Sequence, residues 1–420
     1  MPAVRHTRAT ALVLCVAVVF ATAGCKAGPR PPSPVQRVTI ALLTAVTGAS
    51  SALGSQASQG AQLAVDLVNG DVVDIPLPLA AGAGLPGLGG ARMTLTVADS
   101  AGDAGRVTAA LDKIDAAAVV AADAAPVVEA AARLADQRRL PTVDALTDAA
   151  YLTGLGLDWY FRTAPEERAI DGAALALLAN RPGAGTLRRI AVLYPALPAT
   201  PARTMQNLSD LATAAGFTVA GQFPVRAETG AAATSANDVE DAVPDALLAV
   251  AGTAAEAAAQ LRVASRVRPV VPVVGLGAGF ATASDPDETP EVLLRAAGWS
   301  ADLTSRNPVA RAVADLYKRR FNAPMTETAA ATFTATMAVA TAINGAGAVD
   351  PASVRAGLHQ LWIPATQTIM PWDGIRFVAS GQNELAGGVV EQRSGTAFRV
   401  VYPRELAAAA ATWPSPKPSR

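Results

Sequence analysis

Apolar runs of strand length alternate along the chain with segments whose apolar residues recur at helical spacing. Residues 38–43 form a continuous apolar run with β-branched side chains, which predicts a strand buried on both faces of a parallel sheet. A polar loop with Thr47 and Gly48 follows, and an amphipathic helix is predicted from about residue 56. This is the first unit of a doubly wound α/β domain, where ligands bind beyond the carboxyl ends of the strands.

The same alternation continues through most of the chain. It predicts α/β architecture with two doubly wound parallel-sheet lobes. Further strands are predicted at 93–97, 116–121, 140–143, 190–194, 246–251, 270–274, 375–378 and within 388–401. Helices are predicted at 126–138, 171–180, 201–215, 254–265, 307–321 and 327–344. The Gly- and Pro-rich segment 70–92 has no periodicity, so we expect a surface loop there.

The first 24 residues have the pattern of a secretory signal, with two arginines followed by an apolar run too short to span a bilayer. The junction before Cys25 resembles a bacterial lipobox, which implies acylation of that cysteine and a membrane anchor; the alternative is an ordinary buried or free cysteine. Residues 25–36 are proline-rich and predict an extended spacer. Residues 404–420 form a C-terminal tail, and the part after Ala411 is expected to be unstructured and without an assigned function.

Composition narrows the classes of protein further. The chain has 420 residues, 51% hydrophobic and 16% charged, which suits two apolar cores. Cys15 lies within the signal, so the exported protein has no partner for an intramolecular disulfide. Removal of Arg5 and Arg8 leaves 32 basic and 35 acidic residues, a balance of −3 with no basic block. Nucleic acid is therefore excluded as an expected partner.

Residues suited to catalysis are few. His359 is the one histidine outside the signal, and no metal-ligand spacing or nucleophile motif occurs, so we expect neither an enzyme nor a cofactor or metal. The glycines at 275–279 follow a strand but precede turn-forming residues, which favours a cleft loop over a dinucleotide site. Glu166 and Glu167 are expected to charge the first turn of a helix.

Several motifs together resemble the type I periplasmic binding proteins, in the branched-chain amino acid (Leu/Ile/Val) branch of ABC-transporter solute receptors. The likeness covers about residues 37–402, and its motifs are Thr47-Gly48, Leu53-Gly54, Leu63-Ala64-Val65-Asp66, the Asp99 turn, Tyr160-Phe161-Arg162-Thr163 and Trp372-Asp373-Gly374. It implies a hinge that the chain crosses near Thr163, Trp299 and Pro364. It also implies one lobe of 37–163 plus 300–363 and a second of 164–299 plus 364–403.

The resemblance also implies positions for a ligand site. These are Thr47, Gly48, Leu53, Ala125, Leu146, Asp148, Tyr194, Thr253 and Gly277. Most depart from the family pattern. Leu53 replaces a covering aromatic residue, Ala125 a serine and Asp148 a threonine, while Ala199 and Thr253 replace tyrosines. Leu146 corresponds to a backbone donor for the ligand carboxylate, and Gly277 replaces the glutamate that neutralises the ligand ammonium.

These departures predict that the ligand is not a branched-chain amino acid, because a buried ammonium without a counter-charge is heavily penalised. Asp148 either faces the cleft, where it would favour a cation or a polyhydroxylated ligand, or caps the helix entered at Ala149. We expect an exported, lipid-anchored receptor that closes on a small polar solute and delivers it to an ABC permease. The alternative is a ligand-free lipoprotein of the same fold that serves as a regulatory or protein-interaction module.

Overall fold

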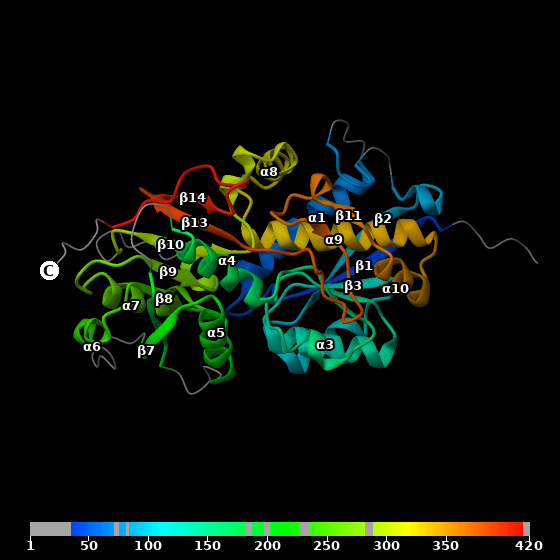
Figure 1. Cartoon of the computed structure of the whole chain (residues 1–420). Coiled ribbons are helices and arrows are strands. Elements are labelled where there is room, and N and C mark those ends of the chain that lie inside the picture. The colour runs from blue at the N-terminus through cyan, green and yellow to red at the C-terminus, as the bar shows by residue number, and fades with distance from the viewer. Residues whose placement is uncertain are drawn as a thin grey trace, which may run out of the picture. The chain divides into compact units, whose positions relative to one another are not determined.

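A computed structural model describes residues 35–70, 75–80, 84–181, 187–196, 202–226, 235–281 and 289–414 (Figure 1). Cys25, the signal, most of the spacer and Ala199 lie outside these residues. No helix of the described ranges is both long enough and apolar enough to cross a bilayer.

The first sheet is built around the predicted opening strand. Its order is β2-β1-β3-β4-β5 and every neighbouring pair is parallel. Side chains of β1 alternate between two cores, with Ile40 and Leu42 on one face and Ala41 and Leu43 on the other. The strands are β1 (Arg37–Thr44), β2 (Arg92–Asp99), β3 (Ala118–Ala121), β4 (Thr142–Asp144) and β5 (Tyr160–Arg162).

Helices cover both faces of this sheet. Apolar residues of α1 (Ser51–Asn69), α8 (Pro308–Phe321), α9 (Glu327–Ala346) and α10 (Pro351–His359) share the core on one face. The other face packs against α2 (Val107–Leu111) and α3 (Ala125–Arg138). The helix α1 begins five residues before the predicted start, which shortens the loop after β1.

Small residues let α1 and α9 approach each other closely, and the two helices run side by side in Figure 1. A Cβ atom on Gly60 would lie 2.2 Å from the carbonyl oxygen of Ala329. The predicted surface loop after α1 is also packed here in part: Leu85 is fully buried, and the Gly87 amide donates to Asn344 Oδ1 at 2.8 Å. The expected surface loop is therefore packed in part, because its leucines join the core that contains α9.

The second sheet has the order β14-β13-β10-β9-β8-β6-β7. The five strands β10, β9, β8, β6 and β7 are parallel to one another, and β13 and β14 extend the sheet in antiparallel orientation. They are β6 (Arg189–Pro195), β7 (Thr218–Val225), β8 (Ala246–Val250), β9 (Val273–Leu276), β10 (Leu293–Ala297), β13 (Val389–Ser394) and β14 (Ala397–Tyr402). Helices α4 (Glu167–Ala179) and α5 (Ala202–Ala214) cover one face, and α6 (Ala236–Asp241) and α7 (Ala254–Ala264) cover the other.

The strands β7 and β10 were not predicted. The edge strand β7 contains Gly221, Gln222 and Pro224, residues that weaken a strand pattern. The strand β10 carries the buried Arg295, whose guanidinium donates to Glu391 on the neighbouring β13 at 2.6 Å. A cross-strand ion pair of this kind interrupts the apolar run by which a central strand is found in a sequence.

The third passage between the sheets lies later than predicted. Pro364 belongs to β11 (Ile363–Pro364), which pairs with β12 (Gly374–Ile375), and Ile375 lies against Phe333 and Met337 of α9. Gln382 is still bridged to Arg162 of the first sheet, whereas Val389 begins β13 of the second. The stretch 363–383 therefore belongs with the first sheet, because its apolar side chains complete the core beside α9.

The start of the expected tail is also packed. Thr412 exchanges two hydrogen bonds of 2.8 Å with Gln392, and Trp413 lies against the second core under the guanidinium of Arg181. The prediction of an unstructured tail was wrong for residues up to 414, since one tryptophan in a polar sequence is enough to attach it.

Candidate ligand site at the carboxyl ends of the strands

Six of the predicted site residues lie at the carboxyl edge of the first sheet. Since all five strands are parallel, the loops that follow them meet at one edge. Leu53, in the first turn of α1, is 52% exposed and offers an apolar surface to solvent. The others are Thr47 and Gly48 after β1, Ala125 at the start of α3, and Leu146 and Asp148 after β4.

The other three predicted residues lie at or near the carboxyl edge of the second sheet. Tyr194 is in β6, half-buried against the core. Thr253 is the N-cap of α7, where its hydroxyl accepts from the Glu256 amide at 3.3 Å. Gly277 follows β9 with φ +91°, and a Cβ atom there would lie 2.6 Å from the carbonyl oxygen of Ala251. This backbone excludes any side chain at that position, the expected glutamate included.

Asp99, the last residue of β2, takes up the donors of the loop after β1. Its carboxylate accepts from the amides of Val46 at 3.0 Å and Thr47 at 3.3 Å, and from the Thr47 hydroxyl at 2.6 Å. The Thr47 hydroxyl, followed by backbone amides, holds the pKa of Asp99 below its usual range. The loop is thus ordered by an internal carboxylate, and these amides are not free for a ligand.

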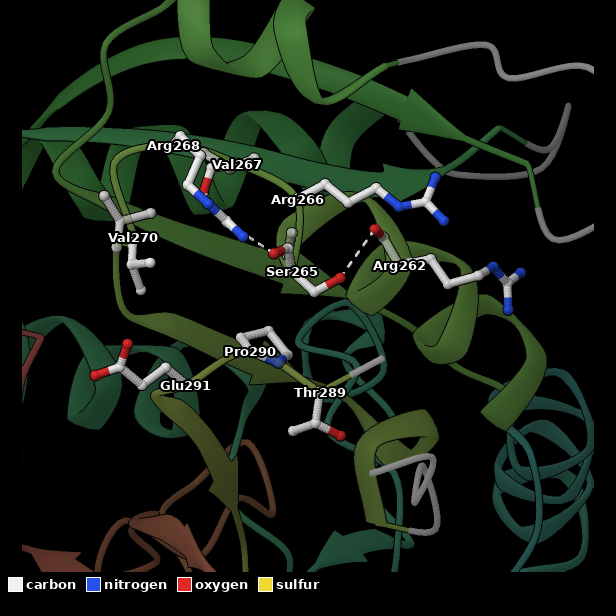
Figure 2. Close-up of a pocket in the computed structure, with 11 residues that line it drawn as sticks. Arg262, Ser265, Arg266, Val267, Arg268, Val270, Thr289, Pro290 and Glu291 are labelled. Carbon is white, nitrogen blue, oxygen red and sulfur yellow. Dashed lines mark hydrogen bonds between the residues drawn. The ribbon is translucent and has the colours of Figure 1, made fainter. Parts of the chain in front are cut away.

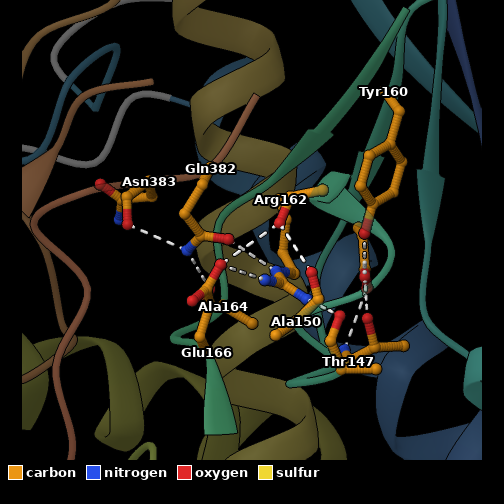
Figure 3. Close-up of polar contacts among 11 residues, drawn as sticks. Thr147, Ala150, Tyr160, Arg162, Ala164, Glu166, Gln382 and Asn383 are labelled. Carbon is orange, nitrogen blue, oxygen red and sulfur yellow. Dashed lines mark hydrogen bonds and ion pairs between the residues drawn. The ribbon is translucent and has the colours of Figure 1, made fainter. Parts of the chain in front are cut away.

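Asp144, the last residue of β4, does the same in the next loop. It is fully buried and accepts from the amides of Leu146 and Thr147, each at 3.0 Å, from the Tyr160 hydroxyl at 2.8 Å and from the Thr147 hydroxyl (Figure 3). Burial nevertheless raises its pKa. The Leu146 amide, which the resemblance assigns to a ligand carboxylate, donates to Asp144 in this structure.

Arg162, at the end of β5, is the buried cation of this region. Its Nε donates to Gln382 Oε1 at 2.7 Å, Nη1 to the Ala149 carbonyl at 2.6 Å and Nη2 to Glu166 at 3.1 Å (Figure 3). Each of its nitrogens therefore has a partner. Gln382 in turn donates to the Ala164 carbonyl at 2.9 Å, which joins two of the passages between the sheets.

Three carboxylates gather beside this network without a similar set of donors. The Glu167 amide at the start of α4 donates to the Asp148 carbonyl at 2.8 Å, and Asp171 lies one turn further along α4 on the same side as Glu167. The side chain of Asp148 is exposed to solvent. Asp171 is only 7% exposed.

Burial raises the pKa of all three carboxyl groups, and the charge of Asp148 raises the pKa of Glu167 and Asp171 further. Burial, and then the charge of Asp148, raises the pKa of Glu167 to about 7. Burial, with Glu167 and Asp148 as further causes, raises the pKa of Asp171 well above its usual range. Burial is also the main cause of the raised pKa of Asp148, while Arg162 opposes it. This cluster of Asp148, Glu167 and Asp171, called the acidic recess below, is the electrostatically most strained part of the candidate site.

A cavity of about 470 Å³ lies elsewhere, beside the segments that lead into β9 and β10, at the opposite edge of the second sheet (Figure 2). Arg262, Arg266 and Arg268 are among its lining residues. Arg268 donates to the carbonyls of Ser265 at 2.8 Å and Val267 at 2.9 Å, so it closes the end of α7. Within the described ranges, no group of three or more His, Cys, Asp or Glu residues has the arrangement of a metal site.

Comparisons with known proteins agree with this architecture. The family model for periplasmic binding proteins matches residues 37–382, and the chain belongs to that family. A search of curated proteins finds no significant match. The predicted family and fold class are confirmed.

Solved structures with the same fold are substrate-binding proteins of ABC transporters, which agrees with the prediction that the chain is not an enzyme. A Desulfitobacterium hafniense protein in complex with leucine has 20% identity and a TM-score of 0.68, over 87% of this chain and 99% of its own. An isoleucine complex from Streptococcus pneumoniae has 16% identity, 90% and 100% coverage and a TM-score of 0.66. An R. palustris protein in complex with benzoate has 14% identity, 89% and 98% coverage and a TM-score of 0.64.

Asp144 and Asp171 are not among the site residues predicted from the sequence, and Glu167 was expected only to charge the first turn of a helix. The sequence contains one signal for Asp144. It ends an apolar strand and is followed in the loop by the hydroxyl residue Thr147, much as Asp99 ends its strand before Ser100. No sequence pattern indicates that α4 begins against the loop after β4, because that contact depends on where the chain crosses between the sheets.

Proposed function

We propose that this protein is an extracytoplasmic substrate-binding receptor of an ABC importer and that its ligand is a small polar solute. The observation that carries the proposal is the placement of Thr47, Asp148, Thr253 and Gly277 at the carboxyl edges of two parallel sheets joined by several passages. In such a fold a ligand binds in the crevice beyond the strand ends, and closure of the lobes over it produces the form that docks on a permease.

Leucine, isoleucine and valine are poor candidates for this ligand. Their carboxylate needs hydrogen-bond donors, yet the amides of Thr47 and Leu146 already serve Asp99 and Asp144. Their ammonium needs a counter-charge, and Gly277 offers none in the place where the resembling receptors have a glutamate. The solved relatives are consistent with varied specificity, because benzoate as well as leucine and isoleucine occupies members of this fold.

Mass spectrometry of the natively purified protein tests the receptor function. The protein is denatured after extensive desalting, and small molecules released in stoichiometric amount are identified. We expect one solute at close to one molecule per chain, or uptake of one when the stripped protein is returned to cell extract. If no small molecule is retained in either preparation, the receptor function is wrong.

A second candidate function is a ligand-free regulatory or protein-interaction module. The observation in its favour is that internal carboxylates already fill two loops that would hold a ligand anion. Such a module would retain no solute, and its thermal stability would not respond to cell extract depleted of proteins. Copurification of a stoichiometric protein partner, in the absence of any solute, would then favour the module.

Export and anchoring form a separate part of the proposal. The signal at 1–24 and the lipobox-like junction support acylation of Cys25 and attachment to the outer face of the cytoplasmic membrane. Cys25→Ser should move the protein from the membrane fraction to the soluble one. Unchanged membrane association would refute the anchor and leave the receptor function standing.

We also propose lobe boundaries that follow the passages of the chain. One lobe would comprise residues 37–163 and 300–383, and it would follow the short spacer. The other lobe would comprise residues 164–299 and 384–403. The network around Gln382 and Asn383 would then be the hinge, because their side chains bond to the carbonyls of Ala164 and Thr163. Several passages permit closure while they restrict sideways movement of the lobes.

A further inference from the structure

The acidic recess differs from the other acidic groups of the candidate site in its hydrogen-bond partners. Asp99, Asp123 and Asp144 each accept hydrogen bonds from backbone amides and a hydroxyl. Elsewhere Glu391, 2% exposed, is paired with Arg295 at 2.6 Å. Among the described residues, by contrast, no side chain donates a hydrogen bond to Asp148, Glu167 or Asp171, and none forms an ion pair with them.

The nearest cation does not neutralise the recess. Arg162 donates to Glu166, Gln382 and the Ala149 carbonyl, and these three bonds engage Nε, Nη1 and Nη2. Its charge is balanced by Glu166, with which it forms an ion pair at 3.1 Å. Three carboxyl groups therefore remain without a positive partner, and one of them, Asp171, is more than nine-tenths buried and has no partner in the described ranges. A buried carboxylate of this kind is costly unless a positive group satisfies it.

The position of the recess matches a ligand site. Asp148 lies beyond the carboxyl end of β4, on the first sheet. The helix α4 precedes the parallel strand β6 and packs against α5, so its first turns lie at the carboxyl edge of the second sheet. The elements that carry the three carboxylates thus lie at the carboxyl edges of the two sheets, where this fold binds solutes. The Glu167 amide does not compete for them, because it donates to the backbone carbonyl of Asp148.

We propose that the solute is cationic and that its protonated amine binds in the acidic recess, between Asp148, Glu167 and Asp171. This assignment rests on the proposed receptor function and specifies its ligand class. It moves the counter-charge for an amine from the loop after β9, where Gly277 excludes a side chain, to the loop after β4 and the start of α4. A small amine with one or two positive charges would supply the hydrogen-bond donors that the three carboxylates lack.

A thermal-shift screen of the full-length protein, stripped of ligand by mild denaturation and refolding, tests the proposal. The probes are 1,3-propanediamine, 1,4-butanediamine, 1,5-pentanediamine and choline; diols of the same three lengths; leucine and benzoate; and calcium and magnesium chloride. Hits are measured by calorimetric titration against Asp171→Asn, Glu167→Gln and Asp148→Asn. Asp315→Asn, an exposed acidic residue on α8, is the matched control.

We expect amines to stabilise the protein and diols of equal length not to, with affinity about tenfold or more weaker for each recess variant and unchanged in Asp315→Asn. Asp171→Asn replaces an unpartnered buried carboxyl group by a neutral amide of the same size, so loss of folding does not account for its weaker binding. Stabilisation only by neutral, anionic or zwitterionic solutes, or only by the metal salts, would overturn the assignment of a cationic ligand. The proposed receptor function would still stand. If no probe and no component of cell extract binds, both fail.

Discussion

Glu167→Gln should stabilise the ligand-free protein at alkaline pH and leave its stability nearly unchanged near pH 4.5. The pKa of Glu167 is raised to about 7 from an ordinary 4.5. Between these values the folded state holds a proton that the unfolded state has lost, so stability falls as pH rises from about 4.5 to about 7 and is constant above. Neutral glutamine removes this fall.

The magnitude follows from the two pKa values. A fully buried group with this difference would lose about 3.4 kcal/mol. Because the Glu167 side chain is only partly buried, we expect about 1.5 kcal/mol at pH 8 after allowance for solvent screening. Urea unfolding at pH 4.5, 6, 7 and 8 measures it. Equal stability of Glu167→Gln and wild type at pH 8, or a wild-type stability that rises across this range in step with the variant, would refute the strained recess.

The adjacent residue provides a control of opposite sign. Glu166 accepts from Arg162 Nη2 at 3.1 Å and from the Thr153 hydroxyl at 3.2 Å. Glu166→Gln weakens a charge-assisted bond to a buried guanidinium, so it should lower the free energy of unfolding by about 1–2 kcal/mol at pH 8. Two identical substitutions at neighbouring positions then shift stability in opposite directions.

Three further variants test the packing and the hinge, each by urea unfolding. Gly60→Ala should cost about 2–4 kcal/mol, because its Cβ would lie 2.2 Å from the Ala329 carbonyl and would force α1 and α9 apart; a neutral effect would contradict the close approach. Arg162→Met should cost about 3–5 kcal/mol by leaving Glu166 and Gln382 without their partner, and an unchanged midpoint would show that the network contributes little. Gly277→Glu should cost about 2 kcal/mol or more without creating leucine binding, whereas a stable variant that binds leucine would refute the backbone constraint at this position.

Most of the fold could be predicted from the sequence because its elements are regular. The run at β1 is buried on both faces, and α9 is an uninterrupted run of small and apolar residues. The failures lie where tertiary contacts replace local pattern. The strand β10 contains Arg295, whose burial is tolerated because Glu391 lies opposite it on β13. Pro364 indicates the end of a strand in the sequence, although it pairs with Gly374 in the structure.

The candidate site was predictable in its location but not in its chemistry. Correspondence with a family places Leu146 and Gly277 at strand ends, and the structure places them there. It does not reveal that Asp144 occupies the Leu146 amide, since that bond depends on the loop conformation. Nor does it reveal the contact between Asp148 and the start of α4, which brings together residues separated by a passage between two sheets.

We infer that the candidate site is unsuited to the zwitterion of a branched-chain amino acid. Calorimetric titration of ligand-stripped protein with leucine, isoleucine and valine tests it most directly. With partners lost for both charges, at roughly 1.5–3 kcal/mol each, affinity should be weaker by about two to four orders of magnitude than in a tight receptor. We therefore expect no dissociation constant tighter than about 10 µM for any of the three, and a submicromolar value for one of them would contradict the account.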